Sequence, residues 1–266
     1  MKIENGVRRI YVRAFWCCTN LTSVTIPNTV EFIEKEAFQG CSSLKSVIIP
    51  NNLKNISMYA FDGCLGLTEV VIPDSVETIG KGAFNNCNSL AEIALPENLT
   101  GIGEGAFGNC TSLKEITVPK NTSGIIANPF WGCDTLKSIK VDEDNQDFCD
   151  IDGVMYSKDR DKLFACPGSF TSYIIPDGVT SINAYAFKNS TNLTGITIPS
   201  SVKSIGEYAF DSCTNLKVQV PATVTTIERG AFYGCNRYNI TFATGVPQAQ
   251  IDDSFAKPYN NNVDME

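Results

Sequence analysis

The chain contains no histidine among its 266 residues, and this absence excludes several kinds of chemistry. Ser-His-Asp and Cys-His catalysis both use an imidazole as the general base. Zinc and haem sites with histidine ligands are excluded for the same reason. Any general acid or base would therefore have to be a carboxylate, a lysine, a tyrosine or a cysteine.

Long hydrophobic runs and an excess of positive charge are also missing. No window approaches 18 consecutive apolar residues, so no segment is predicted to span a membrane. The net charge is −8, whereas nucleic acids and anionic membrane surfaces require partners rich in Lys and Arg. Neither is expected as a partner. The opening segment MKIENGVRRIYVRAFWCC lacks the apolar run and the cleavage site of a signal peptide.

A repeat of about 23 residues fills most of the chain. Its phenylalanines are separated by 23, 23, 23, 23, 23, 57, 23 and 22 residues. A leucine that opens each unit and a proline after each strand-like segment keep the same register, and chance does not produce three such series. The series are Phe15, Phe38, Phe61, Phe84, Phe107, Phe130, Phe187, Phe210 and Phe232; Leu21, Leu44, Leu67, Leu90, Leu113, Leu136, Leu193 and Leu216; and Pro27, Pro50, Pro73, Pro96, Pro119, Pro176, Pro199 and Pro221.

The unit reads L-x-x-I-x-I-P-x-x-V-x-x-I-G-x-x-A-F-x-x-C-x-x. In LTSVTIP, Val24 and Ile26 alternate with polar residues, which indicates a half-buried strand that Pro27 ends. One unit cannot bury its own apolar residues, but stacked units build a parallel sheet with strands about 4.8 Å apart. No long 3.6-residue periodicity follows, so we expect short strands, turns or 3₁₀ turns on the other side.

The 57-residue step holds one unit plus about 34 extra residues. GVMY and KLFACP flank the polar segment SKDRD, which predicts a β-hairpin within an insertion at 142–172. Residues 1–242 are predicted to form one solenoid of about ten units, and 243–266 a C-terminal cap or loose tail. Because the chain starts inside a unit, we expect it to belong to a longer array.

The insertion also carries an acidic run. Its spacing does not match an EF-hand loop, so a solvated loop is favoured over a calcium site. A glycosidase-like pair of carboxylates is the best case for an enzyme, but nothing places these groups in a cleft. The acidic residues are Asp142, Glu143, Asp144, Asp147, Asp150 and Asp152.

Repeats such as LTEVVIPDSVETIGKGAFNNCNS closely resemble the BspA-type, or Treponema pallidum-type, leucine-rich repeat family over residues 3–242. The resemblance implies a curved right-handed solenoid with a strand-lined face and a β-hairpin between repeats. No catalytic residue comes with the family, and from the residues themselves we expect no cofactor and no metal. Members are typically surface or secreted proteins of host-associated bacteria and some protists, linked to adhesion, matrix binding and aggregation. Ser190, Pro129 and Thr122 depart from the repeat pattern.

Eight of the eleven cysteines occupy the same position of the repeat. Neighbouring rungs of a ladder point the same way, a geometry that suits neither a disulfide nor a tetrahedral zinc site. A buried ladder of free thiols is therefore favoured, and Ser190 on one rung supports it. A disulfide between Cys149 and Cys166 stays open as the less favoured alternative. The ladder cysteines are Cys18, Cys41, Cys64, Cys87, Cys110, Cys133, Cys213 and Cys235.

Binding is expected through side chains that point out of the strand face. Alternation within the strands predicts an apolar column beside an acidic one, with Lys45, Lys114 and Lys137 as sources of compensating charge. A partner with a basic and apolar surface would suit this patch, although an ordinary solvated sheet is the simpler interpretation. The candidates are Ile48, Glu69, Val71, Glu92, Ala94, Glu115, Thr117 and Lys140.

Three functions compete. The first is a non-enzymatic adhesin-like scaffold at the cell surface or secreted, which binds host or matrix proteins. The second is an intracellular protein-interaction scaffold, favoured by free thiols and by the lack of a signal peptide in this chain. The third is an enzyme, for which the sequence offers least.

Overall fold

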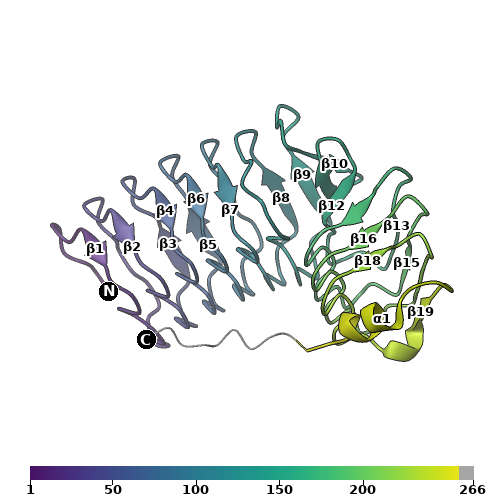
Figure 1. The fold of residues 1–266 in the computed structure, drawn as a ribbon. Coiled ribbons are helices and arrows are strands. Elements are labelled where there is room, and N and C mark those ends of the chain that lie inside the picture. Colours follow the sequence, from purple (N-terminus) through teal and green to yellow (C-terminus); the bar gives the residue numbers. More distant parts are fainter. Residues whose placement is uncertain (258–266) are drawn as a thin grey trace.

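The structure is a computed structural model that describes residues 1–257. The chain winds into stacked coils that together form an arch (Figure 1). Turns that contain the Ala-Phe pairs follow the inner edge of the arch, and turns that follow the prolines lie along its outer edge. The end of the predicted tail, 258–266, lies outside the described residues.

Most coils have two short strands, one on each flank of the arch. The flank built from the second half of the unit carries the longer ladders, one of five strands and one of six. The five-stranded parallel ladder contains β1 (Arg9–Ile10), β2 (Phe32–Ile33), β4 (Asn55–Ile56), β6 (Thr78–Ile79) and β7 (Gly101–Ile102). The six-stranded ladder contains β10 (Phe148–Ile151), β11 (Val154–Ser157), β12 (Lys162–Ala165), β14 (Ser181–Ile182), β16 (Ser204–Ile205) and β18 (Thr226–Ile227).

The L-x-x-I-x-I segments form the other flank, which we call the strand flank. The predicted continuous sheet is here divided into two-stranded parallel pairs. The parallel solenoid is as expected. The more continuous strand pairing, however, lies on the opposite flank, where the sequence predicted only short strands, turns or 3₁₀ turns. The pairs are β3 (Ser46–Ile48) with β5 (Glu69–Val71), β8 (Glu115–Val118) with β9 (Ser138–Val141), β13 (Ser172–Ile174) with β15 (Gly195–Thr197), and β17 (Val218–Val220) with β19 (Ile240–Phe242).

Phenylalanine rings stack along the interior as the repeat predicts. From Phe15 to Phe130, neighbouring rings lie 5.0–5.9 Å apart between centroids and are nearly parallel. A second stack runs from Phe187 to Phe232, with spacings of 4.9 and 5.2 Å. Such offset stacking adds to the free energy that burial of the rings already supplies.

The core is divided where the insertion interrupts the repeat. One cluster extends from Ile10 to Ile139 and includes Phe148, Met155 and Ala165 of the insertion, and the other extends from Val154 to Ile240. We therefore distinguish an N-terminal arm (1–135), a wedge unit (136–169) and a C-terminal arm (170–257). The coils change direction at the wedge unit (Figure 1).

The wedge unit explains the change of direction. The expected hairpin is confirmed, since β11 and β12 pair antiparallel, and β10 adds a third strand that the sequence did not predict. Leu163 of β12 is paired in parallel with Ile182 of β14, so β12 takes the place of an ordinary second-half strand. The segment CPGS at 166–169 replaces the A-F-x-x-C turn. Compared with an ordinary unit, the wedge unit therefore has more residues at the outer edge of the arch and fewer at the inner edge.

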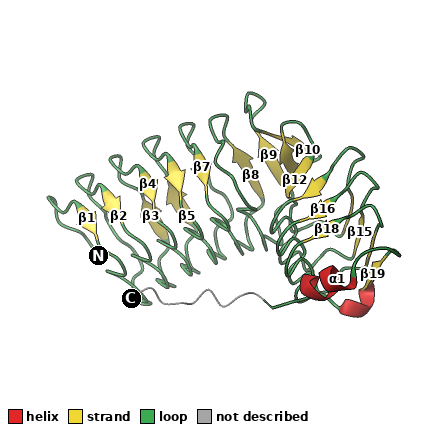
Figure 2. Cartoon of the chain, in the orientation of Figure 1, coloured by secondary structure: helices red, strands yellow, loops and turns green. Residues whose placement is uncertain are grey.

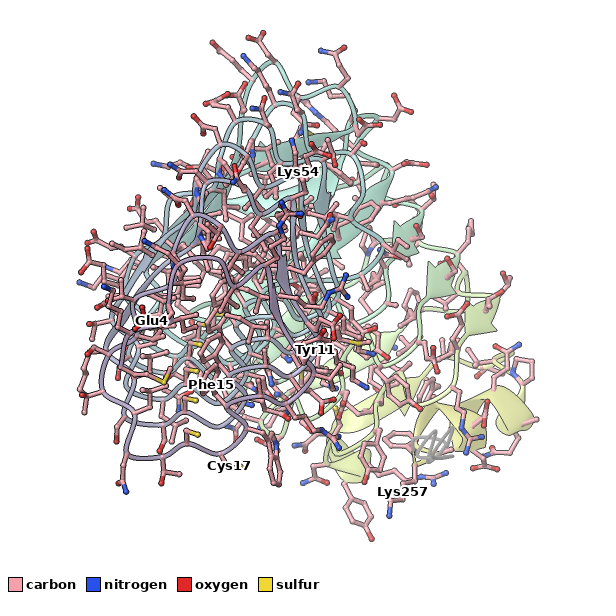
Figure 3. The ribbon with its side chains drawn as sticks, turned by 90° about the vertical axis from the view of Figure 1, so that its left-hand side faces the viewer. Glu4, Tyr11, Phe15, Cys17, Lys54 and Lys257 are labelled. Carbon is pink, nitrogen blue, oxygen red and sulfur yellow. The ribbon has the colours of Figure 1, made fainter. Side chains whose placement is uncertain are left out.

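All eleven cysteines are free thiols. In each complete rung, the thiol donates to the carbonyl of the phenylalanine in the preceding unit, for example from Cys87 to Phe61 at 3.4 Å. Cys18 departs from the prediction because it is exposed at the first, open rung. In the end-on view, Cys17 lies at the lower, inner side of the coils and Lys54 at the opposite side (Figure 3).

The C-terminal coil is covered by a short helix, α1 (Gln248–Ser254), which Figure 2 colours red beside the 3₁₀ turn η1 (Arg237–Asn239). Gly230 and Phe232 donate their backbone N–H groups to the carbonyls of Asp253 and Ser254. These bonds replace the contacts that the turn of a further unit would make. Among residues 1–257, no helix is long and apolar enough to cross a membrane.

Candidate functional site

The predicted binding residues all lie exposed on the strand flank. Ile48 and Val71 are cross-strand neighbours in β3 and β5, and their exposed fractions are 66% and 46%. Thr117 of β8 is paired with Lys140 of β9 in the same manner. The alternation read from the sequence therefore assigned the correct residues to the outward side. Whether they bind a partner stays a prediction.

The acidic column is compensated differently from the prediction. Lys140 lies 3.6 Å from the Glu115 carboxylate, whereas Lys45, Lys114 and Lys137 form none of the ion pairs found in the described chain. Within residues 1–257, Glu69 and Glu92 have no cationic group within 4 Å. Two neighbouring carboxylates of the patch thus remain available for charges from outside.

The sheet of the strand flank has a gap between β5 and β8. Residues 92–95 would supply the intervening strand but have no regular pairing. Two alanines, Ala91 and Ala94, stand in this segment, and alanine contributes little to cross-strand packing. Ile93 and Leu95 are only partly buried, although their counterparts Val47 and Ile49 in β3 and the next residue are fully covered.

A cavity of about 360 Å³ opens at this gap. Ile93, Ala94 and Leu95 line it, together with Ile116, which is only 2% exposed. Carboxylates of Glu97, Glu115 and Asp142 stand around it. The arrangement is a groove of mixed polar and apolar lining, in which Glu97 and Glu115 are paired with Lys120 and Lys140.

The gap decides which predicted residues come together. Ala94, Glu115 and Thr117 line the same cavity. Ile48 and Val71 lie beyond the gap, on the β3–β5 pair, and Lys140 lies on β9. Sequence reasoning missed Ile93 and Leu95, which the repeat pattern assigns to the core. The two alanines of AEIALP were the available signal.

The acidic run of the insertion is explained by local structure. An oxygen of Asp150 accepts the backbone N–H of Val141 at 2.8 Å, and Asp142 accepts that of Asp144 at 2.9 Å. These bonds fix turns. Among the described residues, no three His, Cys, Asp or Glu side chains are grouped so that they could hold a metal ion.

The ladder thiols are poor candidates for nucleophilic chemistry. Burial raises the pKa of Cys110 to about 12 and that of Cys41 to about 11. Because the thiolate is the reactive form, these groups stay inert near neutral pH. The sulfur atoms contribute packing and weak hydrogen bonds.

Comparison with solved structures identifies the same fold in bacterial proteins. A leucine-rich repeat protein from Eubacterium ventriosum is 25% identical, with a TM-score of 0.73 over 85% of this chain and 61% of that one. A leucine-rich cell surface protein from Faecalibacterium prausnitzii is 27% identical, with a TM-score of 0.61 over 95% of this chain and 87% of the other. Pneumococcal vaccine antigen PcpA is 23% identical, with a TM-score of 0.62 over 91% of this chain and 66% of that one.

This chain therefore spans less than two thirds of the first of these structures. A search of curated proteins gave no match. The sequence profile of the BspA-type leucine-rich repeat region, in six copies, matches residues 8–144 and 160–257. Repeats of this kind are generally non-enzymatic scaffolds for protein–protein interaction. Since the match covers most of the chain, the protein belongs to the BspA-type leucine-rich repeat family.

Proposed function

We propose that this protein is an adhesin-like interaction module at the cell surface, which binds a protein partner through the strand flank. The observation that carries the proposal is the gap between β5 and β8. It leaves Ile93 and Leu95 only partly buried, in a cavity that Glu97, Glu115 and Asp142 also line. The related Faecalibacterium prausnitzii structure is described as a cell surface protein, which supports this location for the present chain.

The chemistry of the groove defines the partner. An apolar side chain of the partner would pack against Ile93 and Leu95, and neighbouring lysines or arginines would meet Glu69, Glu92 and Glu115. Apolar contact supplies most of the binding free energy, while charges on the rim accelerate association and select the partner. The expected partner is therefore a host or matrix protein with a basic, partly apolar surface.

The test uses purified extracellular-matrix proteins and mucins immobilised on a biosensor. The triple variant Glu69→Lys, Glu92→Lys, Glu115→Lys should lose at least tenfold in affinity for each partner of the parent protein, because attraction becomes repulsion. The control variant Glu4→Lys, Asp159→Lys, Asp177→Lys makes the same change of net charge at exposed positions outside the groove. Unchanged binding by the first variant, or equal loss in both, would contradict the proposed site.

An intracellular scaffold is the second candidate, and the free thiols are the observation that favours it. The ladder geometry weakens this argument. Cys64 to Cys133 are buried and separated from oxidants by the coil, so they would persist as thiols outside the cell as well. Exposed Cys17 and Cys18 are the sensitive residues. Their redox state in protein isolated from its native cells distinguishes the two locations, because reduced thiols indicate an intracellular protein and oxidised ones a protein at the cell surface.

A further inference from the structure

The inner edge of the arch holds a second cavity, at the place where the two arms meet. It has a volume of about 260 Å³ and receives side chains from both arms, including Tyr59 and Glu104 from one and Tyr185 from the other. The wedge unit brings these groups together because it lacks an A-F-x-x-C turn. Trp131 consequently lies against Tyr185, with 5.4 Å between ring centroids, although 54 residues separate them in the sequence.

Other contacts also join the arms at this place. The buried side chain of Asn128 donates to the carbonyls of Tyr185 and Ala186, at 3.1 and 3.2 Å. Asn189 donates to the amide oxygen of Asn109 at 3.0 Å, across 80 positions of sequence. These bonds hold the two arms in a fixed relation, so the cavity is built into the fold.

The aromatic walls rest on a repeated backbone feature. The residue two positions before each inner-edge phenylalanine commonly has a left-handed backbone, with φ of 57° at Tyr59, 60° at Tyr185 and 60° at Gly82. Tyrosine rarely adopts this conformation, and such residues concentrate at functional sites. The conformation directs each side chain of this series towards the inner edge.

Glycines in the same series make room for the rings. A Cβ on Gly82 would lie 2.3 Å from Tyr59, and a Cβ on Gly105 would lie 2.2 Å from Trp131. Both glycines therefore allow an aromatic ring to occupy the place of a side chain. Between Tyr59 and Trp131 the inner edge consequently carries two glycines flanked by two rings.

The charged groups of the cavity are already paired with one another. Lys81 lies 3.1 Å from Glu104, and Lys188 lies 3.1 Å from Asp211. Lys188 also lies 5.0 Å from the centroid of Trp131, where a cationic ligand would otherwise sit. An anionic ligand finds no unpaired lysine here, and a cationic ligand finds its aromatic face occupied. The remaining chemistry favours a neutral ligand.

From these features we propose that the inner-edge cavity binds the terminal residue of a neutral glycan. A pyranose ring has an apolar face of C–H groups, which suits the ring of Tyr59, and hydroxyls, which suit polar groups at the same cavity; Trp131, covered by Lys188, forms the neighbouring wall. Lys81 supplies a donor, Glu104 an acceptor and Asn85 an amide. The volume lies just below the usual 300 Å³ lower limit of ligand pockets, and therefore suits one sugar residue rather than a long chain.

The fluorescence of Trp131 provides a direct test. The chain has two tryptophans, so Trp16→Phe leaves Trp131 as the single reporter. This variant is titrated with galactose, glucose, mannose, N-acetylglucosamine, N-acetylgalactosamine and their neutral oligosaccharides, and with sialyllactose and a heparin oligosaccharide as acidic comparisons. At least one neutral sugar should produce a saturable change in emission, with weaker or no effect from the acidic sugars.

Two further substitutions, made in the Trp16→Phe protein, assign the signal to the cavity. Glu104→Gln keeps the size of the side chain, and Tyr59→Ala removes one wall. Each should weaken binding about tenfold or more, as loss of one charge-assisted hydrogen bond or one stacking surface would. Tyr238→Ala changes an exposed tyrosine outside the cavity and should bind like the parent. The proposal is overturned if no neutral sugar binds, if only acidic sugars bind, or if Glu104→Gln binds as tightly as the parent.

Discussion

The N-terminal arm and the wedge unit differ in how regularly the coils stack on one another. In the arm, each coil repeats the last, and five stacked pairs of phenylalanines fill the interior. In the wedge unit the inner turn is missing and Phe130 has no phenylalanine stacked on its far side among the described residues. The comparison shows that regularity makes the protein stable, while one departure from it creates a cavity that no regular coil contains.

The largest expected effect is the loss of a ring from the regular stack. Phe84 is fully buried and stacks on both Phe61 and Phe107, at 5.4 and 5.5 Å. Phe84→Ala should lower the free energy of unfolding by about 3–5 kcal/mol. Phe130→Ala should have a smaller effect, because Phe130 stacks only on Phe107 and each aromatic pair contributes about 0.5–1.5 kcal/mol. Urea unfolding followed by circular dichroism measures both. An equal or larger effect at Phe130 would remove the distinction between arm and wedge.

A smaller effect is expected at the junction of the arms. Asn128 accepts the backbone N–H of Phe130 at 2.8 Å in addition to its two bonds with the C-terminal arm. Asn128→Ala leaves the buried N–H of Phe130 without a partner, at about 1–3 kcal/mol, while the carbonyls of Tyr185 and Ala186 keep the backbone N–H groups of Lys188 and Cys166. Asn98→Ala is the matched control, since Asn98 makes one exposed bond to the carbonyl of Asp74. Thermal unfolding should show a clear decrease in Tm for the first and little change for the second. Equal decreases would show that Asn128 does not hold the arms together.

The smallest effect concerns the thiol ladder and its interruption at Ser190. Burial raises the pKa of Cys110 from 9.0 to about 12. Above pH 9 the unfolded chain therefore releases a proton that the folded chain retains, so stability should decrease as the pH rises from about 9 to about 12. The slope from one thiol is at most about 1.4 kcal/mol per pH unit.

Two substitutions change the number of rungs in opposite directions. Cys110→Ser removes one titrating group and should flatten the dependence of unfolding free energy on pH. Ser190→Cys adds a rung at a buried position beside the wedge and should make it steeper. Urea unfolding at pH 8, 9 and 10 gives the slope of unfolding free energy against pH for the parent protein and for each of the two variants. Identical slopes would show that the ladder thiols do not ionise on unfolding in this range.

The repeat register predicted the interior with high fidelity because its spacing alone places residues on the same rung. Phe84, Leu90 and Cys87 could be assigned to the core from their sequence distance to the equivalent residues of neighbouring units alone. The outward residues, such as Ile48 and Glu69, followed from the alternation of strands. Pairing between strands was less predictable: the gap at 92–95 depends on how weakly two alanines hold a strand to its neighbours, and this is decided by packing on both sides.

The inner-edge cavity could not be read from the sequence in the same way. Trp131 and Tyr185 come together because a turn is missing between them. No single residue in the sequence indicates that this turn is missing. Two signals were present in the sequence: the 57-residue step contains no A-F-x-x-C motif, and the position two residues before the phenylalanine is tyrosine or glycine in six of the nine units. These signals predict a cavity only when it is known that the A-F-x-x-C turns form the inner edge of the arch.

The wedge unit has a consequence for how such proteins diversify. Since it lengthens the outer edge and shortens the inner edge, its place in the array determines where the arch bends and which two turns face each other. Displacement of the wedge by one 23-residue unit would replace Trp131 and Tyr185 by a different pair of inner-edge residues, with every strand and core position unchanged. Recombination between coils that share the same core positions can therefore replace one inner-edge cavity by another while the interior is kept.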